Sequence, residues 1–131
     1  MKIVHTSGKR KTAIARATLK TGKGHVTING KNLEQYTPEL YKLRMQEPLI
    51  LAGEIAKKVN ISLKVIGGGY ASQSEAIRLA IARALSEHEP KLKNMFSDYD
   101  RQLLVADVRR KEPAKPNRQG NARAKRQKSY R

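Results

Sequence analysis

The stretch ISLKVIGGGYASQSEAIRLAIARAL, residues 61–85, decides the fold class of this chain. Residues 61–66 alternate between apolar and polar side chains, a pattern typical of a half-buried strand. The glycine triplet at 67–69 ends this strand, and the capping-box pattern of residues 72–75 predicts the start of a helix. Arg78 and Arg83 fall away from the expected core face of the helix. That face is formed by apolar residues at helical spacing: Ile77, Ala80, Ile81, Ala84 and Leu85.

Three more strands are predicted upstream, because period-two patterning recurs in three short segments: residues 3–6, 12–19 and 25–28. Turn-forming residues at 7–11 and 21–24 separate these segments, and we expect both to be hairpin connections. The first of the two turns carries three adjacent cations. Asn29 and Gly30 are expected to close the third strand.

Two helices are predicted between the third strand and residue 61. Residues 37–39, Thr-Pro-Glu, form a start signal for a helix that reaches Gln46. Pro48 is expected to interrupt this helix, because proline removes a backbone donor and clashes with the preceding turn. A second helix follows from Leu51 and ends at Asn60.

The remaining elements lie after the long helix of residues 72–87. His88, Glu89 and Pro90 stop that helix, and the apolar residues that follow predict a last short helix and a strand before Asp107. The order of elements predicts an α+β fold in two layers, a sheet with helices on one face.

The charge balance predicts a polyanionic partner. The chain has 131 residues, with 28 Lys and Arg against 11 Asp and Glu, so its formal net charge is +17. A merely solvated charged face is the alternative, but such faces normally intersperse acids among the bases. Aromatic residues are sparse, five Tyr and one Phe with no Trp, so phosphate contacts are favoured over stacking on bases.

The last 23 residues differ from the rest of the chain. Residues 109–131 hold ten Lys and Arg but a single acid, Glu112, and very few apolar side chains. No core can form from such a segment, so we expect it to be disordered until RNA orders it. The sequence therefore predicts a globular α+β RNA-binding domain at 1–108 and a basic tail at 109–131.

The composition excludes several classes of protein. Without Cys there is no disulfide framework, thiolate metal site or cysteine nucleophile. No apolar run approaches the length of a membrane-spanning helix, and the N-terminus lacks the apolar region of a signal peptide. We therefore expect a soluble, cytoplasmic protein with no membrane partner.

Metal and cofactor sites are not expected either. The three histidines share no ligand spacing, and the carboxylates of Asp98, Asp100 and Asp107 are typical of turn or cap residues. No nucleophile–base pair is visible in the sequence, so we expect no catalytic residue, no metal and no cofactor.

The glycine triplet allows three interpretations. A strand, a glycine loop and a capped helix in that order can aim backbone amides at a phosphate, but neither GxxxxGK[ST] nor GxGxxG is present. The glycines of residues 67–69 therefore belong to a nucleotide site, to a loop that approaches an RNA phosphate, or to a structural turn that needs positive φ. The cations of residues 9–11 and of the tail are two separate sources of phosphate contacts.

Three motifs, taken together, resemble the small-subunit ribosomal protein S nine family. They are GKRKTAIAR at 8–16, the glycine triplet followed by AIRLAIARAL at 76–85, and DVR at 107–109 with a terminal QKSYR at 127–131. The resemblance spans the whole chain. The terminal QKSYR looks like that of the archaeal and eukaryotic branch.

The resemblance implies a structural protein of the small-subunit head, in the ribosome of the cytoplasm, whose fold is like domain two of ribosomal protein S five. Its implied partners are ribosomal RNA, peptidyl-site tRNA and neighbouring head proteins. The alternatives are a small phosphate-binding enzyme that uses the glycine loop and an RNA-processing subunit of related fold.

The resemblance, with the charge pattern, also assigns expected contacts. The residues expected on ribosomal RNA are Lys9, Arg10, Lys11, Arg16, Gly67, Gly68, Gly69, Arg109, Arg110, Lys111, Arg118, Arg123, Lys125 and Arg126. Those expected on tRNA are Lys128, Tyr130 and Arg131.

Overall fold

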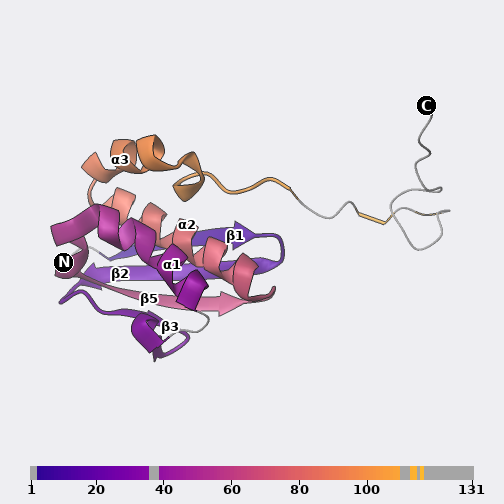
Figure 1. The fold of residues 1–131 in the computed structure, drawn as a ribbon, viewed down its shortest axis with the longest axis horizontal. Coiled ribbons are helices and arrows are strands. Elements are labelled where there is room, and N and C mark those ends of the chain that lie inside the picture. Colours follow the sequence, from indigo (N-terminus) through magenta and orange to yellow (C-terminus); the bar gives the residue numbers. More distant parts are fainter. Residues whose placement is uncertain (1–2, 36–38, 110–112, 115, 117–131) are drawn as a thin grey trace.

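The computed structural model describes residues 3–35, 39–109, 113–114 and 116. These residues form one sheet with helices packed against it (Figure 1). The strands are β1 (Val4–Arg10), β2 (Ala13–Thr21), β3 (Val26–Ile28), β4 (Lys31–Asn32) and β5 (Val59–Ile66). The α-helices are α1 (Glu39–Ala52), α2 (Tyr70–His88) and α3 (Lys91–Tyr99). Three 3₁₀ helices connect them: η1 (Leu33–Gln35), η2 (Gly53–Lys58) and η3 (Arg101–Leu103).

The sheet is mixed, with the strand order β1-β2-β5-β3-β4. All neighbouring strands are antiparallel except β3 and β5, which run parallel. A parallel pair needs a crossover connection, and here α1 lies within it. Helices α1 and α2 lie on the same face of the sheet, and α3 packs against these two helices (Figure 1). The predicted α+β class, with helices on one face, is confirmed.

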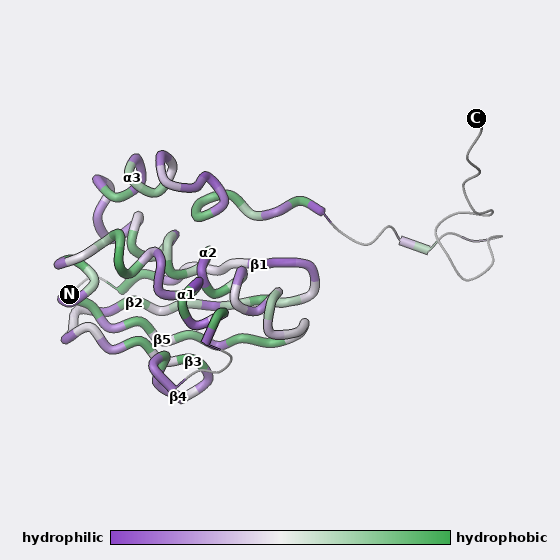
Figure 2. Tube along the Cα trace, viewed as in Figure 1, coloured by the Kyte–Doolittle hydropathy of each residue, from purple (hydrophilic) through white to green (hydrophobic). Residues whose placement is uncertain are grey.

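The core lies between the sheet and α2. Every second residue of β5, and of β2 from Ala13 to Leu19, is buried, which is the period of a strand with one covered face. Figure 2 shows the apolar residues gathering on these strands and on α2, with hydrophilic residues along the turn between β1 and β2. The predicted core face of the long helix is confirmed, since all of its members are fully buried: Ile77, Ala80, Ile81, Ala84 and Leu85.

The hairpin predicted at residues 21–24 is wrong, because β5 lies between β2 and β3. Strand β5 is long and alternates strictly, and it pairs with β2 from Ile14 to Thr21. The short β3 offers far fewer ladder hydrogen bonds, so β5 takes the central place. The connection between β2 and β3 is instead held against the end of η2, where the Gly22 amide donates to the Lys58 carbonyl at 2.9 Å.

The first hairpin is confirmed, but its turn is shorter than expected. Strand β1 continues through Arg10, so the turn consists of Lys11 and Thr12 alone. Packing explains the extension, because Gly8 presses against α2. A Cβ at this position would lie 2.3 Å from the Ala76 carbonyl oxygen and 2.8 Å from the Ala80 nitrogen.

The expected break at Pro48 is wrong, because α1 continues through it to Ala52. An interior proline costs about 3 kcal/mol in helix stability, and here its ring is fully buried in the core, which offsets that cost. The second predicted helix is the 3₁₀ segment η2, and Asn60 lies in β5. The start signal at residues 37–38 lies outside the described residues.

Two further expectations differ from the structure. Helix α2 begins at Tyr70 with Gly69 as its N-cap, so the capping box at 72–75 is wrong. The Ser74 hydroxyl donates to the Ala71 carbonyl inside the helix at 2.7 Å instead. In place of the strand expected before Asp107, the chain forms the 3₁₀ turn η3.

Candidate nucleic-acid interface

The turn between β1 and β2 presents the first group of predicted RNA contacts. Lys9 and Lys11 are exposed, and Lys11 adopts a φ of 53°, which allows the two-residue turn. Arg10 faces the other way, toward the helices, and forms an ion pair with Asp107. Lys9 and Lys11 are thus available to a ligand, whereas the charge of Arg10 is already partnered.

The glycine loop packs against this turn. Gly67 and Gly68 both have positive φ, 76° and 67°. A Cβ on Gly67 would lie 2.4 Å from the Thr12 carbonyl oxygen, and one on Gly68 would lie 3.0 Å from the Ala13 Cβ. A structural turn therefore accounts for both glycines. A Cβ on Gly69 would meet nothing within 4 Å, so the space beside this residue is open.

The N-terminus of α2 follows this open glycine. No side chain caps the helix, so its first amides have no side-chain acceptor. The preceding glycines pack against Thr12 and Ala13, so the positive end of the helix dipole lies near the turn between β1 and β2. The Gln73 side chain donates to the Gly67 carbonyl at 3.0 Å and fixes the loop relative to the helix. Exposed cations and free amides at one end of the sheet make an environment that favours anions.

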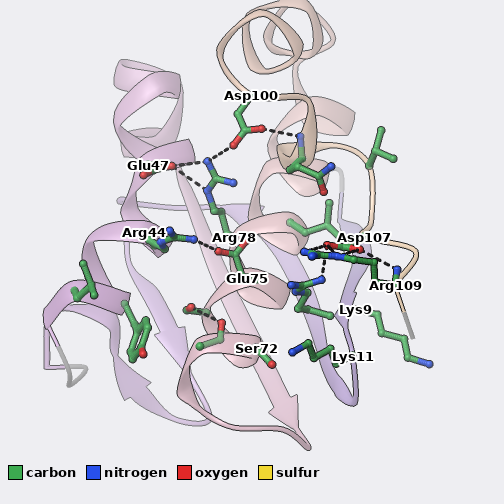
Figure 3. Close-up of a pocket in the computed structure, with 18 of the residues that line it drawn as sticks. Lys9, Lys11, Arg44, Glu47, Ser72, Glu75, Arg78, Asp100, Asp107 and Arg109 are labelled. Carbon is green, nitrogen blue, oxygen red and sulfur yellow. Dashed lines mark hydrogen bonds and ion pairs between the residues drawn. The ribbon is translucent and has the colours of Figure 1, made fainter. Parts of the chain in front are cut away.

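A cleft of about 830 Å³ opens beside these groups. The β1–β2 turn, α1, α2 and the segment from Tyr99 to Arg109 line it (Figure 3). Lys9, Lys11 and Ser72 lie at one end of the cleft. The other end holds charged side chains that pair with each other: Arg44 with Glu75, and Arg78 with Glu47 and Asp100.

Arg78 is buried at the back of this cleft, although the sequence placed it away from the core. Its Nε donates to Glu47 at 2.9 Å and its Nη2 to Asp100 at 3.0 Å, as Figure 3 shows. Burial alone would lower the pKa of Arg78, but the hydrogen bonds to the two carboxylates raise it. The group stays charged and ties α2 to α1 and η3, so its role is structural.

Two of the carboxylates considered for a metal, Asp100 and Asp107, have structural partners. Asp100 accepts a hydrogen bond from the Gln102 amide at 3.0 Å and caps η3, which confirms the cap interpretation for this residue. Asp107 accepts hydrogen bonds from the Arg109 side chain and amide, which hold the pKa of its carboxyl well below the usual value. Within the described ranges, no cluster of three or more His, Asp or Glu side chains could hold a metal ion.

Asp107 also joins the two basic elements. It forms one ion pair with Arg10 in β1. It forms another with Arg109, the first residue of the predicted tail (Figure 3). The ion pair with Arg10 therefore ties Asp107 to β1. Arg83 supports this arrangement, because its guanidinium donates to the Ser7 carbonyl at 2.9 Å and to the Leu104 carbonyl at 3.2 Å.

Arg16 does not join the cleft. It lies in the middle of β2 on the face of the sheet opposite the helices, paired in register with Ser7 and adjacent to Lys64 of β5. Sequence reasoning missed Lys64 and Lys20 as members of this face. The signal was present, because both occupy the polar positions of the same period-two patterns that identified the strands.

The remaining predicted contacts lie outside the described residues: Arg110, Lys111, Arg118, Arg123, Lys125, Arg126, Lys128, Tyr130 and Arg131. In the part of the chain that the structure describes, no helix combines the length and the apolar character needed to cross a bilayer.

Comparison with known proteins identifies the family. The model of the family described as ribosomal protein S9/S16 matches residues 8–131. The small ribosomal subunit protein uS9 of Methanococcus maripaludis strain C7 is 52% identical to this chain over 134 residues, which cover both chains completely. The proteins of the same name from M. maripaludis strain C5 and from Methanococcus vannielii show the same identity and coverage. With a basic, anion-favouring end on an α+β body and a family match over nearly its whole length, the chain belongs to the ribosomal protein S9/S16 family.

Proposed function

We propose that this protein is a structural constituent of the small ribosomal subunit, where it binds the ribosomal RNA of the head. The observation that carries the proposal is the end-to-end match to proteins named small ribosomal subunit protein uS9. The protein is structural rather than an enzyme, its partners are ribosomal RNA and other ribosomal proteins, and it works in the ribosome, in the cytoplasm. Membership of this family favours neither the phosphate-binding enzyme nor the RNA-processing subunit.

The body, residues 1–108, contacts ribosomal RNA through its basic turn. Lys9 and Lys11 are exposed, and the glycine loop packs beside them. The uncapped N-terminus of α2, which begins after Gly69, adds backbone donors. These groups suit phosphate oxygens, which accept hydrogen bonds from amides and attract cations. Arg10 supports the turn through its ion pair with Asp107.

The tail, residues 109–131, orders on RNA and reaches the peptidyl-site tRNA. Its ten cations against one acid support a segment that needs polyanions as neighbours. Lys128, Tyr130 and Arg131 are the proposed tRNA contacts, by the resemblance of the terminal motif to the family. Removal of Arg131 tests this role: tRNA retention in assembled small subunits should weaken while assembly is unchanged, and equal retention would contradict it.

The fold is proposed to be like domain two of ribosomal protein S five. Support comes from the mixed sheet with helices on one face and from the parallel pair β3–β5 joined through α1. Such a body leaves the other face of its sheet free for a ligand.

Gradient sedimentation of a native extract tests the function. The untagged protein should travel with the small subunit and leave it when salt screens the phosphate contacts. Sedimentation only at the top of the gradient, at low salt, would contradict the proposal.

A further inference from the structure

The face of the sheet opposite α1 and α2 carries cations and no acid. Arg16 and Lys20 of β2 and Lys64 of β5 are exposed on it, because they occupy the uncovered positions of their strands. None of the five strands contains an Asp or Glu. Among the described residues, none of these three cations takes part in an ion pair.

The register brings these cations close together. Arg16 pairs with Lys64 across the β2–β5 ladder, so their backbones lie about 5 Å apart. Lys20 lies four residues along the same strand, about 13 Å from Arg16. The hydroxyl residues Thr18 and Ser62, also paired in register, fill the space between them.

Like charges directly opposite each other destabilise a sheet. Arg16 and Lys64 form such a pair near the middle of the uncovered face, on central strands, and no nearby carboxylate of the strands compensates them. A polyanion over this face removes the repulsion. The arrangement is therefore unfavourable in the free protein and favourable in a complex.

The side chains of the face also indicate which nucleic-acid feature they meet. The strands contain no Phe, Tyr or Trp, so unpaired bases find no broad stacking surface there. Cations and hydroxyls instead match phosphates and the 2′-hydroxyls that line the wide, shallow minor groove of an RNA double helix.

We propose that the uncovered face of β1, β2 and β5 is a second RNA-binding surface, which takes the backbone of double-helical RNA through Arg16, Lys20 and Lys64. This inference rests on the proposed function and adds a surface to it. The surface is distinct from the cleft, which lies on the helical side, and Lys9 borders both because it pairs in register with Ile14 at the end of the face. The body thus holds RNA on two sides.

The test compares two variants of the full chain that lose the same charge. Lys20→Gln with Lys64→Gln changes the uncovered face, and Lys91→Gln with Lys93→Gln changes exposed residues of α3, on the helical side of the molecule. Circular dichroism checks that both variants fold. The probes are a short RNA duplex and an oligouridine of equal length, and the measurement is the dissociation constant over a series of salt concentrations.

The quantity compared is the slope of the logarithm of the binding constant against the logarithm of the salt concentration. For the duplex, the magnitude of this slope should fall by about 1.8 in the sheet-face variant, because each phosphate that a cation neutralises contributes about 0.9. The α3 variant should keep the slope of the unchanged protein. An unchanged slope in the sheet-face variant, an equal fall in both variants, or tighter binding of oligouridine than of duplex would each overturn the inference.

Sedimentation separates this result from the wider function. If the unchanged protein travels with small subunits while the sheet-face variant keeps its full salt slope, only the second surface is wrong. If the unchanged protein does not travel with small subunits, the proposed function itself fails.

Discussion

Arg78 places a guanidinium in the interior of the body, where only 6% of the residue is exposed. A buried charge is tolerated only when it is paired and hydrogen-bonded, and Glu47 and Asp100 satisfy both needs. The pair of carboxylates comes from two different elements, α1 and the start of η3. One side chain thus fixes how three elements pack.

Replacement of Arg78 by Met should destabilise the protein by about 2–3 kcal/mol. The loss is smaller than for a fully buried ion pair, because the side chains of Glu47 and Asp100 are 33% and 38% exposed and water can reach them. Urea unfolding measures the change. The control is Arg44→Met, which breaks an exposed ion pair with Glu75 and should cost less than about 1 kcal/mol. Equal losses would contradict a special role for Arg78.

The same site predicts a pH dependence. Burial alone would raise the pKa of Asp100, but hydrogen bonds from the Gln102 amide and Arg78 lower it below the usual value for an aspartate. A carboxyl whose pKa is lower in the folded state contributes stability at pH above its unfolded pKa and loses it as pH falls through its folded pKa.

Unfolding midpoints in urea between about pH 5 and about pH 2 check this dependence. The Asp100→Asn variant should be less stable at the upper end and should lose less stability on acidification than the unchanged protein. Asp98→Asn, at an exposed position of α3, is the control and should follow the unchanged protein. If the unfolding midpoints of the unchanged protein and of Asp100→Asn fell by the same amount on acidification, the prediction would be refuted.

At the scale of elements, β1 and α2 approach each other more closely than side chains normally allow. Gly8 makes this possible, since a Cβ there would overlap backbone atoms of α2. Backbone atoms of a long helix cannot move aside as a flexible side chain can.

Gly8→Ala should therefore cost about 1–3 kcal/mol of stability, by overpacking. Gly69→Ala is the matched control, because the position is open and its φ of −100° suits any residue. It should change stability by no more than about 0.5 kcal/mol. Thermal melts measure the stability of both variants. If Gly8→Ala left the stability unchanged, β1 would have to be able to shift away from α2.

Sequence patterns over neighbouring residues predicted those elements that depend only on such neighbours. The β1–β2 hairpin and the core face of α2 follow from alternation and helical spacing, and both are confirmed. Two errors have a tertiary cause. Burial of Pro48 maintains a helix that the sequence alone would end, and the longer ladder of β5 displaces β3 from β2.

The candidate site was also predictable only where its residues are neighbours in the sequence. Clustered cations identify the basic turn directly, because they are neighbours in sequence. Lys64 becomes a neighbour of Arg16 only through the pairing of β2 with β5, which no local pattern specifies. The partners of Arg78 lie 31 and 22 residues away, so its burial was not predictable from helical spacing.

The whole molecule combines a compact body with a highly charged C-terminal segment. Residues 109–131 carry ten of the 28 cations and one of the 11 acids. If the tail supplies many of the phosphate contacts, its removal should change the salt dependence of RNA binding more than any substitution in the body.

Deletion of residues 109–131 should flatten the salt dependence of binding to head-domain RNA, by about 0.9 in logarithmic slope for each phosphate that the tail neutralises. Filter binding over a salt series measures it. A variant in which Lys91 and Lys93 of α3 are replaced by Gln serves as a control for charge removal in the body. An unchanged slope in the deletion variant would mean that the tail contributes little to RNA binding.

The confinement of carboxylates to segments outside the strands has one more consequence, for the kinetics of binding. With every carboxylate of the described chain outside the strands, the body has an electric dipole moment as well as a net charge. The field of a polyanion exerts a torque on such a molecule, and it turns the molecule during diffusion, before the first contact forms. Encounters then favour the orientations in which the strands face the polyanion, so a larger share of collisions is productive.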